Sequence, residues 1–239
     1  MKKNRDFFYL QYNKINWKNQ EKTKINSYIY EWIIRNIILK HRGDNISIFD
    51  IGFGIGFFIK MLAENFIGKY KEIVIEGCEP SRVNYGYFAE KKIGGVNLKT
   101  HPKSFLEVSS EKKFDYLTAI YVFPHFLSED LENIVRKIRS MLVKDGQFIL
   151  VLANEKYLQE KLDNEKDLFI EKGEVEYGGK KYKEILHYSD IPEIGKVIDY
   201  NRDDSLYIDM FTQNGFSLKS KEELNDSGFL CSLFVFAKI

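Results

Sequence analysis

The sequence contains little cysteine, little proline and no long apolar run. Only two of its 239 residues are cysteines, Cys78 and Cys231, and both lie in apolar stretches, which indicates buried reduced thiols and excludes a disulfide scaffold. Its four prolines are scattered singly, so no proline-rich linker marks a domain boundary. No apolar run reaches the about 18 residues of a membrane span, and the first residues lack the apolar core of a secretory signal. We therefore expect one cytoplasmic domain without a membrane partner.

The sequence also has no large excess of charge of one sign. Lys and Arg number 36 against 35 Asp and Glu, and the resulting net charge of +1 gives no overall field that would attract nucleic acid. We therefore expect no nucleic-acid partner. Neither the cysteines nor any cluster of His and carboxylate residues has the spacing of a zinc or magnesium motif, so no metal is predicted.

What is present is a regular alternation of strand and helix patterns. Apolar residues recur at helical spacing over 19–41, which predicts an amphipathic helix within an N-terminal arm. Short apolar, strand-like runs are expected at 46–51, 72–78, 96–100, 114–123 and 147–152. Short strands that alternate with helices indicate an α/β fold, a doubly wound and mostly parallel sheet.

The alternation breaks between residues 153 and 203. Charged residues there alternate with Tyr, Ile and Val, and Gly178-Gly179 is typical of a hairpin turn, so we expect a small antiparallel, β-rich insertion. A helix that begins at Asp203 or Asp204 should follow. Two final strands are predicted after it, and the last is almost entirely apolar, which predicts burial in the sheet.

The most informative stretch is FDIGFGIGF, residues 49–57, at the predicted turn from the first strand into a helix. Open α/β sheets bind ligands at this edge, and glycines permit a sharp turn and a close approach to the ligand. A dinucleotide fingerprint needs a third glycine at position 57, where this chain has Phe57, and its third glycine is Gly56. The alternative of a nicotinamide-dependent oxidoreductase or epimerase is therefore disfavoured.

A second feature is Glu79, at the end of the next predicted strand. An acidic residue at this place accepts hydrogen bonds from ribose hydroxyls in nucleoside-binding sheets. Glu76 lies three residues earlier, on the opposite face of the strand, where we expect a structural or solvated role. His101 is expected to be a solvated loop residue.

In these motifs and those that follow, the sequence resembles the class I S-adenosylmethionine-dependent methyltransferases from about residue 46 onward. FDIGFGIG is similar to the family's glycine-rich first motif, and CEPS is similar to its acidic second-strand motif. FDYLTAIYVFPHF resembles its fourth strand and following loop, LVKDGQFIL its turn into strand five, and the C-terminal strands its closing antiparallel hairpin. The resemblance implies a single Rossmann-like domain over 1–239, with a seven-stranded sheet, a helical arm at 1–43 and a lid insertion at about 153–203.

The resemblance also implies a site for S-adenosylmethionine, which becomes S-adenosylhomocysteine. Asp50 would assist at the ammonium group of the cofactor, Gly52 and Gly54 would pass beneath its methionine portion, and Glu79 would hold its ribose. The further cofactor contacts that the resemblance implies are Gly56, Pro80, Ser104, Phe105, Ile120, Tyr121 and, in the arm, Tyr9 and Tyr12. The two arm tyrosines would act as a lid, unless the arm simply packs on the core. The family often has an acidic residue at the adenine amino group, where this chain reads THPKSFLEV.

The expected acceptor is a small molecule, methylated on oxygen or nitrogen, because the insertion resembles the lids of small-acceptor enzymes. The DNA base methyltransferases usually carry Asn or Asp, then Pro-Pro and an aromatic residue, after strand four, whereas this chain has VFPH. A noncatalytic S-adenosylmethionine-binding protein and any oligomeric state stay open.

If the acceptor must lose a proton, the candidate catalytic residues are His125 and His187. Tyr188, Tyr200 and Arg202 in the insertion are candidate substrate contacts. The structural alternatives are that His125 fixes its own loop, and that Tyr200 and Arg202 form a network at the entry of the following helix.

Overall fold

The computed structural model describes residues 27–89, 91–156, 158, 160, 169–191, 195–226 and 229–239. The helix predicted over 19–41 ends at Asn36 in this structure, and residues 19–26 of that prediction lie outside the described residues. Helix α2 spans Ser27–Asn36, and a 3₁₀ turn, η2, follows at Ile38–Lys40. Ile29 and Ile33 on α2 are fully buried, as the apolar stripe predicts.

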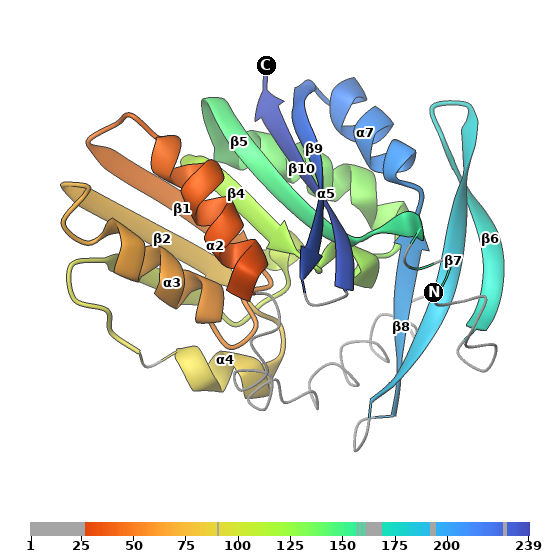
Figure 1. Cartoon of the computed structure of the whole chain (residues 1–239), viewed down its shortest axis with the longest axis horizontal. Coiled ribbons are helices and arrows are strands. Elements are labelled where there is room, and N and C mark those ends of the chain that lie inside the picture. The colour runs from red at the N-terminus through yellow and green to blue at the C-terminus, as the bar shows by residue number, and fades with distance from the viewer. Residues whose placement is uncertain are drawn as a thin grey trace.

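A seven-stranded sheet forms the centre of the described structure (Figure 1). Its strands are β1 (Asn45–Ile51), β2 (Glu72–Cys78), β3 (Asn97–His101), β4 (Phe114–Ile120), β5 (Leu142–Ala153), β9 (Phe216–Asp226) and β10 (Phe229–Lys238). The order is β3-β2-β1-β4-β5-β10-β9. Strands β1 to β5 pair in parallel, and β10 runs antiparallel to β5 and β9. The predicted doubly wound sheet with a C-terminal antiparallel hairpin is confirmed, and its switch point lies between β1 and β4.

Helices cover both faces of this sheet (Figure 1). Helix α3 (Phe57–Phe66) packs with α2 against one face, and α5 (Ser128–Met141) packs with α7 (Asp204–Gln213) against the other. Shorter elements occupy the connections that follow β2, β3 and β4, namely α4 (Arg82–Phe88), η3 (Phe105–Glu107) and η4 (Phe123–His125). Within the ranges given above, no helix is long and apolar enough to cross a bilayer.

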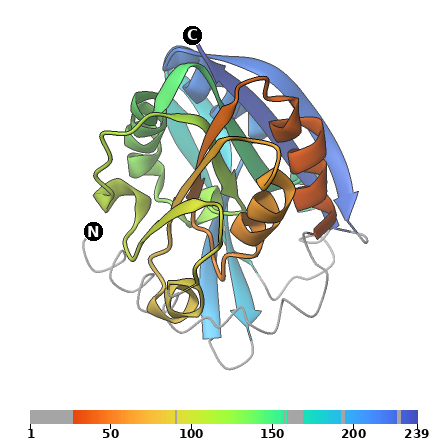
Figure 2. The ribbon, with the colours of Figure 1, turned by 90° about the vertical axis from the view of Figure 1, so that its left-hand side faces the viewer.

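The insertion forms a separate antiparallel sheet of β6 (Phe169–Tyr177), β7 (Lys180–Ile191) and β8 (Gly195–Arg202). Gly178 and Gly179 make its first turn with φ of +58° and +75°, as the hairpin prediction required. In Figures 1 and 2, the end of β7 and the start of β8 point toward the same end of the molecule as α4.

The two ends of the insertion are joined through one buried side chain of the central sheet. Asn154, just after β5, donates a hydrogen bond of 3.0 Å from Nδ2 to Ser232 Oγ on β10. Ser232 Oγ donates in turn to Asp204 Oδ2 at the start of α7, over 3.1 Å. All three side chains are nearly inaccessible to solvent. The chain therefore leaves the core and returns to it at almost the same point.

Two strand boundaries differ from the sequence prediction. Strand β4 ends at Ile120 instead of residue 123, because Tyr121 has a φ of +58° and turns the chain out of the sheet. Strand β5 begins at Leu142 instead of residue 147, across an irregular stretch in which Asp145 has a φ of +62°. The Gly and Asp of this stretch favour a turn, and the strand pairs with β4 on both sides of it, at Leu142 and from Gln147 onward.

The buried polar groups correct one expectation. His101 is not a solvated loop residue: it ends β3, and its Nε2 lies 3.2 Å from Glu76 Oε2. Lys112 Nζ lies 3.2 Å from the other oxygen of Glu76, whose side chain is 1% exposed. Glu76 therefore has a structural role, because its ionic partners compensate for burial. Cys78 and Cys231 are buried free thiols, as predicted.

Candidate functional site

The glycine-rich turn between β1 and α3 has three residues in the left-handed region. Gly52, Gly54 and Gly56 have φ of +68°, +56° and +80°. A Cβ on Gly52 would lie 2.7 Å from Val122, and a Cβ on Gly56 would lie 2.2 Å from the Phe88 ring. A Cβ on Gly54 would meet no atom within 4 Å. The outer two glycines are thus needed for packing, whereas the middle one borders open space that a ligand can use.

Glu79, just after β2, ties this turn to the start of α4. Its Oε2 accepts a hydrogen bond of 2.9 Å from the Gly54 amide, and its Oε1 accepts one of 2.8 Å from the Ser81 amide. Burial raises the pKa of Glu79 to about 7, and the hydrogen bonds from the Ser81 and Gly54 amides oppose the rise. A carboxylate has about four lone-pair sites, so Glu79 retains acceptor capacity for the hydroxyls of a ligand.

Asp50 lies near the end of β1 and is 3% exposed. Its Oδ1 accepts a hydrogen bond of 2.6 Å from Thr118 Oγ1 on β4. Burial raises the pKa of Asp50 to about 7; the Thr118 hydrogen bond lowers it, and the charge of Glu79 adds to the rise. Two carboxyl groups that are costly to ionise therefore lie at one edge of the sheet, where a cationic ligand would stabilise their ionised forms.

A pocket of about 450 Å³, its open mouth included, lies at the switch point of the sheet. Its walls come from the ends of β1 and β2, from η3 and from the loop after β4. The residues that line it are Ile51, Gly52, Cys78, Glu79, Pro80, Ser104, Phe105, Val122, His125 and Phe126. The sequence predicted all of these as site residues except Ile51, Cys78, Val122 and Phe126.

Ser104 and Phe105 form the pocket wall beside β3. The Ser104 amide donates a hydrogen bond of 3.0 Å to the Glu107 carboxylate, which therefore caps η3 instead of facing the pocket. The ammonium group of Lys137 lies 5.1 Å from the centre of the Phe105 ring. Among the described residues that line the pocket, Glu79 is the only carboxylate. This wall therefore offers a ligand a ring and a small polar residue.

His125 lies in η4 and lines the same pocket. Its Nδ1 is 3.0 Å from Oδ1 of Asp199 on β8, and the two side chains are 18% and 22% exposed. In the pairing of β7 with β8, Asp199 lies opposite His187. The insertion thus contributes a carboxylate to a histidine of the central domain.

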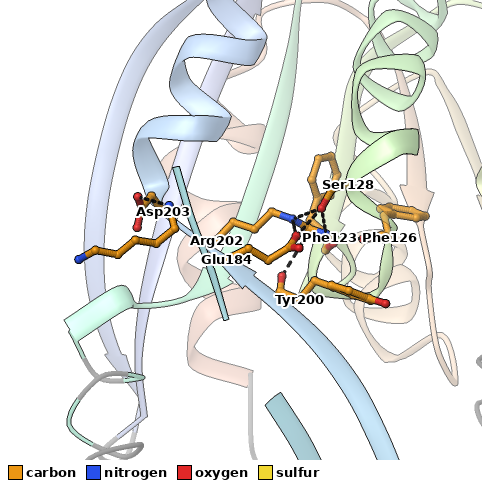
Figure 3. A network of polar contacts seen from close by, with 8 residues as sticks. Phe123, Phe126, Ser128, Glu184, Tyr200, Arg202 and Asp203 are labelled. Carbon is orange, nitrogen blue, oxygen red and sulfur yellow. Dashed lines mark hydrogen bonds and ion pairs between the residues drawn. The ribbon is translucent and has the colours of Figure 1, made fainter. Parts of the chain in front are cut away.

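Arg202, at the end of β8, anchors the insertion (Figure 3). Its side chain is fully buried, and its Nε lies 2.6 Å from Glu184 Oε2 on β7. Its Nη2 donates hydrogen bonds of 2.8 Å to the Phe126 carbonyl and to Ser128 Oγ, and its Nη1 donates one of 3.2 Å to the Tyr200 carbonyl. These contacts use the guanidinium within the protein, which favours the structural network for Arg202 over an acceptor contact.

Ile120 and Tyr121 lie next to the pocket but do not form its wall. Both pack against the apolar cluster on the face of the sheet that α2 and α3 cover. The Tyr121 amide donates a hydrogen bond of 2.9 Å to the Val151 carbonyl, which fixes the exit from β4. Their role as cofactor contacts stays a prediction.

The remaining predicted residues lie in or beyond the insertion. The guanidinium of Arg202 lies 5.2 Å from the centre of the Tyr200 ring, so Tyr200 belongs to the anchoring network. His187 and Tyr188 lie on β7, where only their backbone is described. Tyr9 and Tyr12 lie outside the described residues. The contacts predicted for these four residues stay predictions.

Five residues of the site were missed in the sequence. Ile51, Cys78, Val122 and Phe126 each adjoin a residue that the sequence did single out, so extending the motifs by their neighbours would have found them. No feature of the sequence pointed to Asp199. It lies far from His125 along the chain, and no local pattern predicts how the insertion packs on the core.

A second hollow, of about 360 Å³ with its open mouth included, lies between the insertion and the segment after β5. It is lined by Glu155, Leu158, Lys183, Ile185, Asn201, Arg202 and Asp203. Burial, with the charges of Asp203 and Asp204, raises the pKa of Glu155. Over the described part of the chain, no three or more His, Cys, Asp or Glu side chains gather as a metal site requires.

The sequence matches the family model described as "Methyltransferase domain" over residues 49–150. This range runs from β1 to β5 and includes the glycine turn, Glu79 and His125. No protein of curated function matches the sequence.

Several solved structures have a similar fold. Magnesium protoporphyrin IX methyltransferase from Synechocystis PCC 6803, with bound SAM, is 12% identical with a TM-score of 0.61, over 95% of this chain and 86% of that chain. An S-adenosylmethionine-dependent methyltransferase from Clostridium acetobutylicum ATCC 824 is 13% identical with a TM-score of 0.59, over 93% and 99%. N-methyltransferase NodS from Bradyrhizobium japonicum WM9 is 12% identical with a TM-score of 0.57, over 91% and 98%. At such identities the likeness concerns the fold.

Proposed function

Because residues 49–150 are a methyltransferase domain of the class I S-adenosylmethionine-dependent type, we propose that the protein transfers a methyl group to an oxygen or nitrogen atom of a small-molecule acceptor. One observation carries the proposal. A single pocket at the switch point of the sheet combines the glycine turn, Glu79 and His125. A cofactor-binding edge and a candidate proton acceptor thus share one cavity.

The residues present fit S-adenosylmethionine. Gly54 borders open space, so the backbone of the turn can approach a ligand closely. Glu79 has acceptor capacity for the ribose hydroxyls, and the carboxyl groups of Asp50 and Glu79 at this edge of the sheet would favour a cationic ligand. Phe105 offers a ring face to the adenine. When bound, the cofactor supplies a methyl carbon activated by its positively charged sulfur.

The contribution of the protein is mainly alignment and the exclusion of water. An in-line displacement gains most from holding both reactants in the attack geometry. Most of the pocket wall is apolar, with Ile51, Pro80, Val122 and Phe126 among its residues, and a dry wall weakens competition by solvent. His125 is the residue in the wall that can take a proton from the acceptor.

Charge and the mostly apolar pocket wall support a small acceptor. The net charge of +1 provides no broad positive surface for a polyanion.

The test has two stages. Calorimetric titration with S-adenosylmethionine, S-adenosylhomocysteine and NAD should give binding for the first two and none for NAD. The protein is then incubated with methyl-labelled S-adenosylmethionine and either a small-molecule extract or purified DNA and RNA. Label in the small-molecule fraction supports the proposal, whereas label in nucleic acid alone contradicts it.

A further inference from the structure

We propose that Asp199 of the insertion orients His125 as the general base of this site, and that the acceptor is a hydroxyl compound of the phenol or enol type. The inference rests on the proposed methyl transfer and narrows its acceptor class. It is carried by the contact between Asp199 on β8 and His125 on η4.

The contact involves Nδ1 of the His125 ring, which leaves Nε2 as the nitrogen that can meet the acceptor. His125 Nδ1 and Asp199 Oδ1 are 3.0 Å apart, and both side chains are mostly buried. A carboxylate at this distance favours the hydrogen on Nδ1, and that tautomer would leave the lone pair on Nε2. The same carboxylate stabilises the imidazolium that forms when Nε2 accepts a proton. Asp199 is therefore a positioning residue, and His125 is the residue that meets the acceptor.

The surrounding structure holds the pair in place. Arg202 follows Asp199 on β8, and its buried guanidinium donates to the carbonyls of Phe123 and Phe126, which flank His125 in the loop. Ser128 Oγ, at the start of α5, accepts from both Nε and Nη2 of Arg202. The strand that carries the carboxylate and the loop that carries the imidazole are thus joined on both sides of His125, which preorganises the base.

The pocket chemistry selects the acceptor class. An acceptor carboxylate is already ionised at neutral pH and needs no base, and no Lys or Arg is among the described residues that line the pocket. A neutral amine attacks with its own lone pair and sheds its proton after transfer. A hydroxyl group is a weak nucleophile until its proton leaves, so a base held by a carboxylate serves a hydroxyl acceptor. The apolar walls suit an aromatic or enolic skeleton.

The proposed step moves one proton and one methyl group. His125 Nε2 takes the proton of the acceptor hydroxyl while the hydroxyl oxygen forms its bond to the methyl carbon. The bond between that carbon and the sulfur breaks, and its electron pair stays on the sulfur, which loses its positive charge. The imidazolium then releases its proton to water. Nothing is oxidised or reduced.

The experiment compares three variants with the unchanged protein. His125→Ala removes the base, Asp199→Asn removes the charge that orients it, and Glu174→Gln changes an exposed carboxylate on β6 as a matched control. The probes are phenol, 4-nitrophenol, aniline and benzoate, each supplied with methyl-labelled S-adenosylmethionine. Calorimetry gives cofactor affinity for each variant, and ¹⁵N chemical shifts of the imidazole nitrogens give the tautomer of His125 in the protein without cofactor.

We expect phenol to be methylated by the unchanged protein and by Glu174→Gln. His125→Ala should lower kcat for phenol by roughly 10²-fold to 10⁴-fold, and Asp199→Asn should lower it by more than about tenfold. Both losses should be smaller for 4-nitrophenol, which ionises without help near neutral pH. Cofactor affinity should stay within about twofold, and Asp199→Asn should shift the His125 tautomer away from the Nδ1–H form.

Other outcomes overturn the inference. These are methylation of aniline or benzoate in place of the phenols, methylation of no probe although the cofactor binds, equal losses for phenol and 4-nitrophenol, or an unchanged tautomer in Asp199→Asn. Failure of the unchanged protein to bind S-adenosylmethionine would instead count against the proposed function itself.

Discussion

The Glu79 carboxylate and the Gly54 amide are joined by a hydrogen bond of 2.9 Å that links the turn after β1 to the end of β2. Because the second carboxylate oxygen accepts from the Ser81 amide, Glu79 holds two loops of the pocket at once. A residue chosen in the sequence for ligand binding thus also shapes the site that receives the ligand.

Glu79→Gln should weaken S-adenosylmethionine binding by about 10-fold to 100-fold, because the amide group of Gln points a donor at one of these two backbone amides and removes a charge-assisted bond. Calorimetry on the purified variant measures the change. Glu72→Gln, at the exposed start of the same strand, is the matched control and should bind normally. Equal affinities for the two variants would remove Glu79 from the site.

Gly54→Val should block the cofactor with a limited loss of stability. Its φ of +56° costs a side chain about 1–2 kcal/mol, but no atom lies within 4 Å of the added Cβ, so the branched group would project into the open space beside the turn, where we expect the ligand. Gly68→Val is the control, because Gly68 has a φ of +81°, equally open surroundings and a place on the loop before β2. Thermal unfolding and cofactor titration should show similar stability losses in both variants and lost binding only in Gly54→Val.

The raised pKa values of Asp50 and Glu79, both about 7, make stability and affinity change with pH in opposite directions. Between about pH 4.5 and 7, the folded protein holds protons that the unfolded chain has released. The free energy of unfolding without ligand should therefore fall as pH rises through this window, by at most about 1.4 kcal/mol per pH unit for each carboxyl. A cationic ligand prefers the ionised carboxylates, so its affinity should rise from pH 6 to pH 8.

Chemical denaturation and calorimetry at several pH values measure the two trends. Asp50→Asn removes one of the two carboxyls and should reduce both slopes. Cofactor affinity that is constant from pH 6 to pH 8 would contradict the assignment of these carboxyls to a cationic ligand.

Arg202→Met should destabilise the protein by about 3–5 kcal/mol, because it leaves Glu184 and several buried acceptors without their cation. Denaturant unfolding measures the loss, and limited proteolysis should show faster cleavage within β6 to β8. Lys181→Met, which breaks the exposed pair with Glu174 on the same sheet, should leave unfolding unchanged. Similar behaviour of the two variants would show that Arg202 does not anchor the insertion.

Most of the fold could be predicted from the sequence, because local patterns encode it. Alternating runs of apolar residues located the strands of the central sheet to within a few residues, and Gly178-Gly179 located the hairpin of the insertion. The errors at the end of β4 and the start of β5 arise where Tyr121 and Asp145 adopt positive φ. Tertiary contacts stabilise those conformations, and residue type alone does not predict them.

The parts of the candidate site that lie within a single sequence motif could be predicted. The glycine turn and Glu79 lie at strand ends, and strand ends of a parallel sheet meet at one edge, so spacing was enough to bring them together. The pairing of His125 with Asp199 was not predictable, since it depends on how a second sheet docks on the first. The same reason explains why Arg202 was considered as an acceptor contact, although the fold buries it in an anchor.

The hydrogen bonds from Asn154 to Ser232 and from Ser232 to Asp204 close the base of the insertion against β10. Because the segment departs and returns at one closed point, its length and sequence can vary without altering the register of the seven-stranded sheet. A changed β6–β8 segment would still have to keep Arg202, because its guanidinium holds the loop after β4 and the start of α5. The closed base and this anchor together separate the parts of the insertion that are free to vary from the part that the pocket depends on.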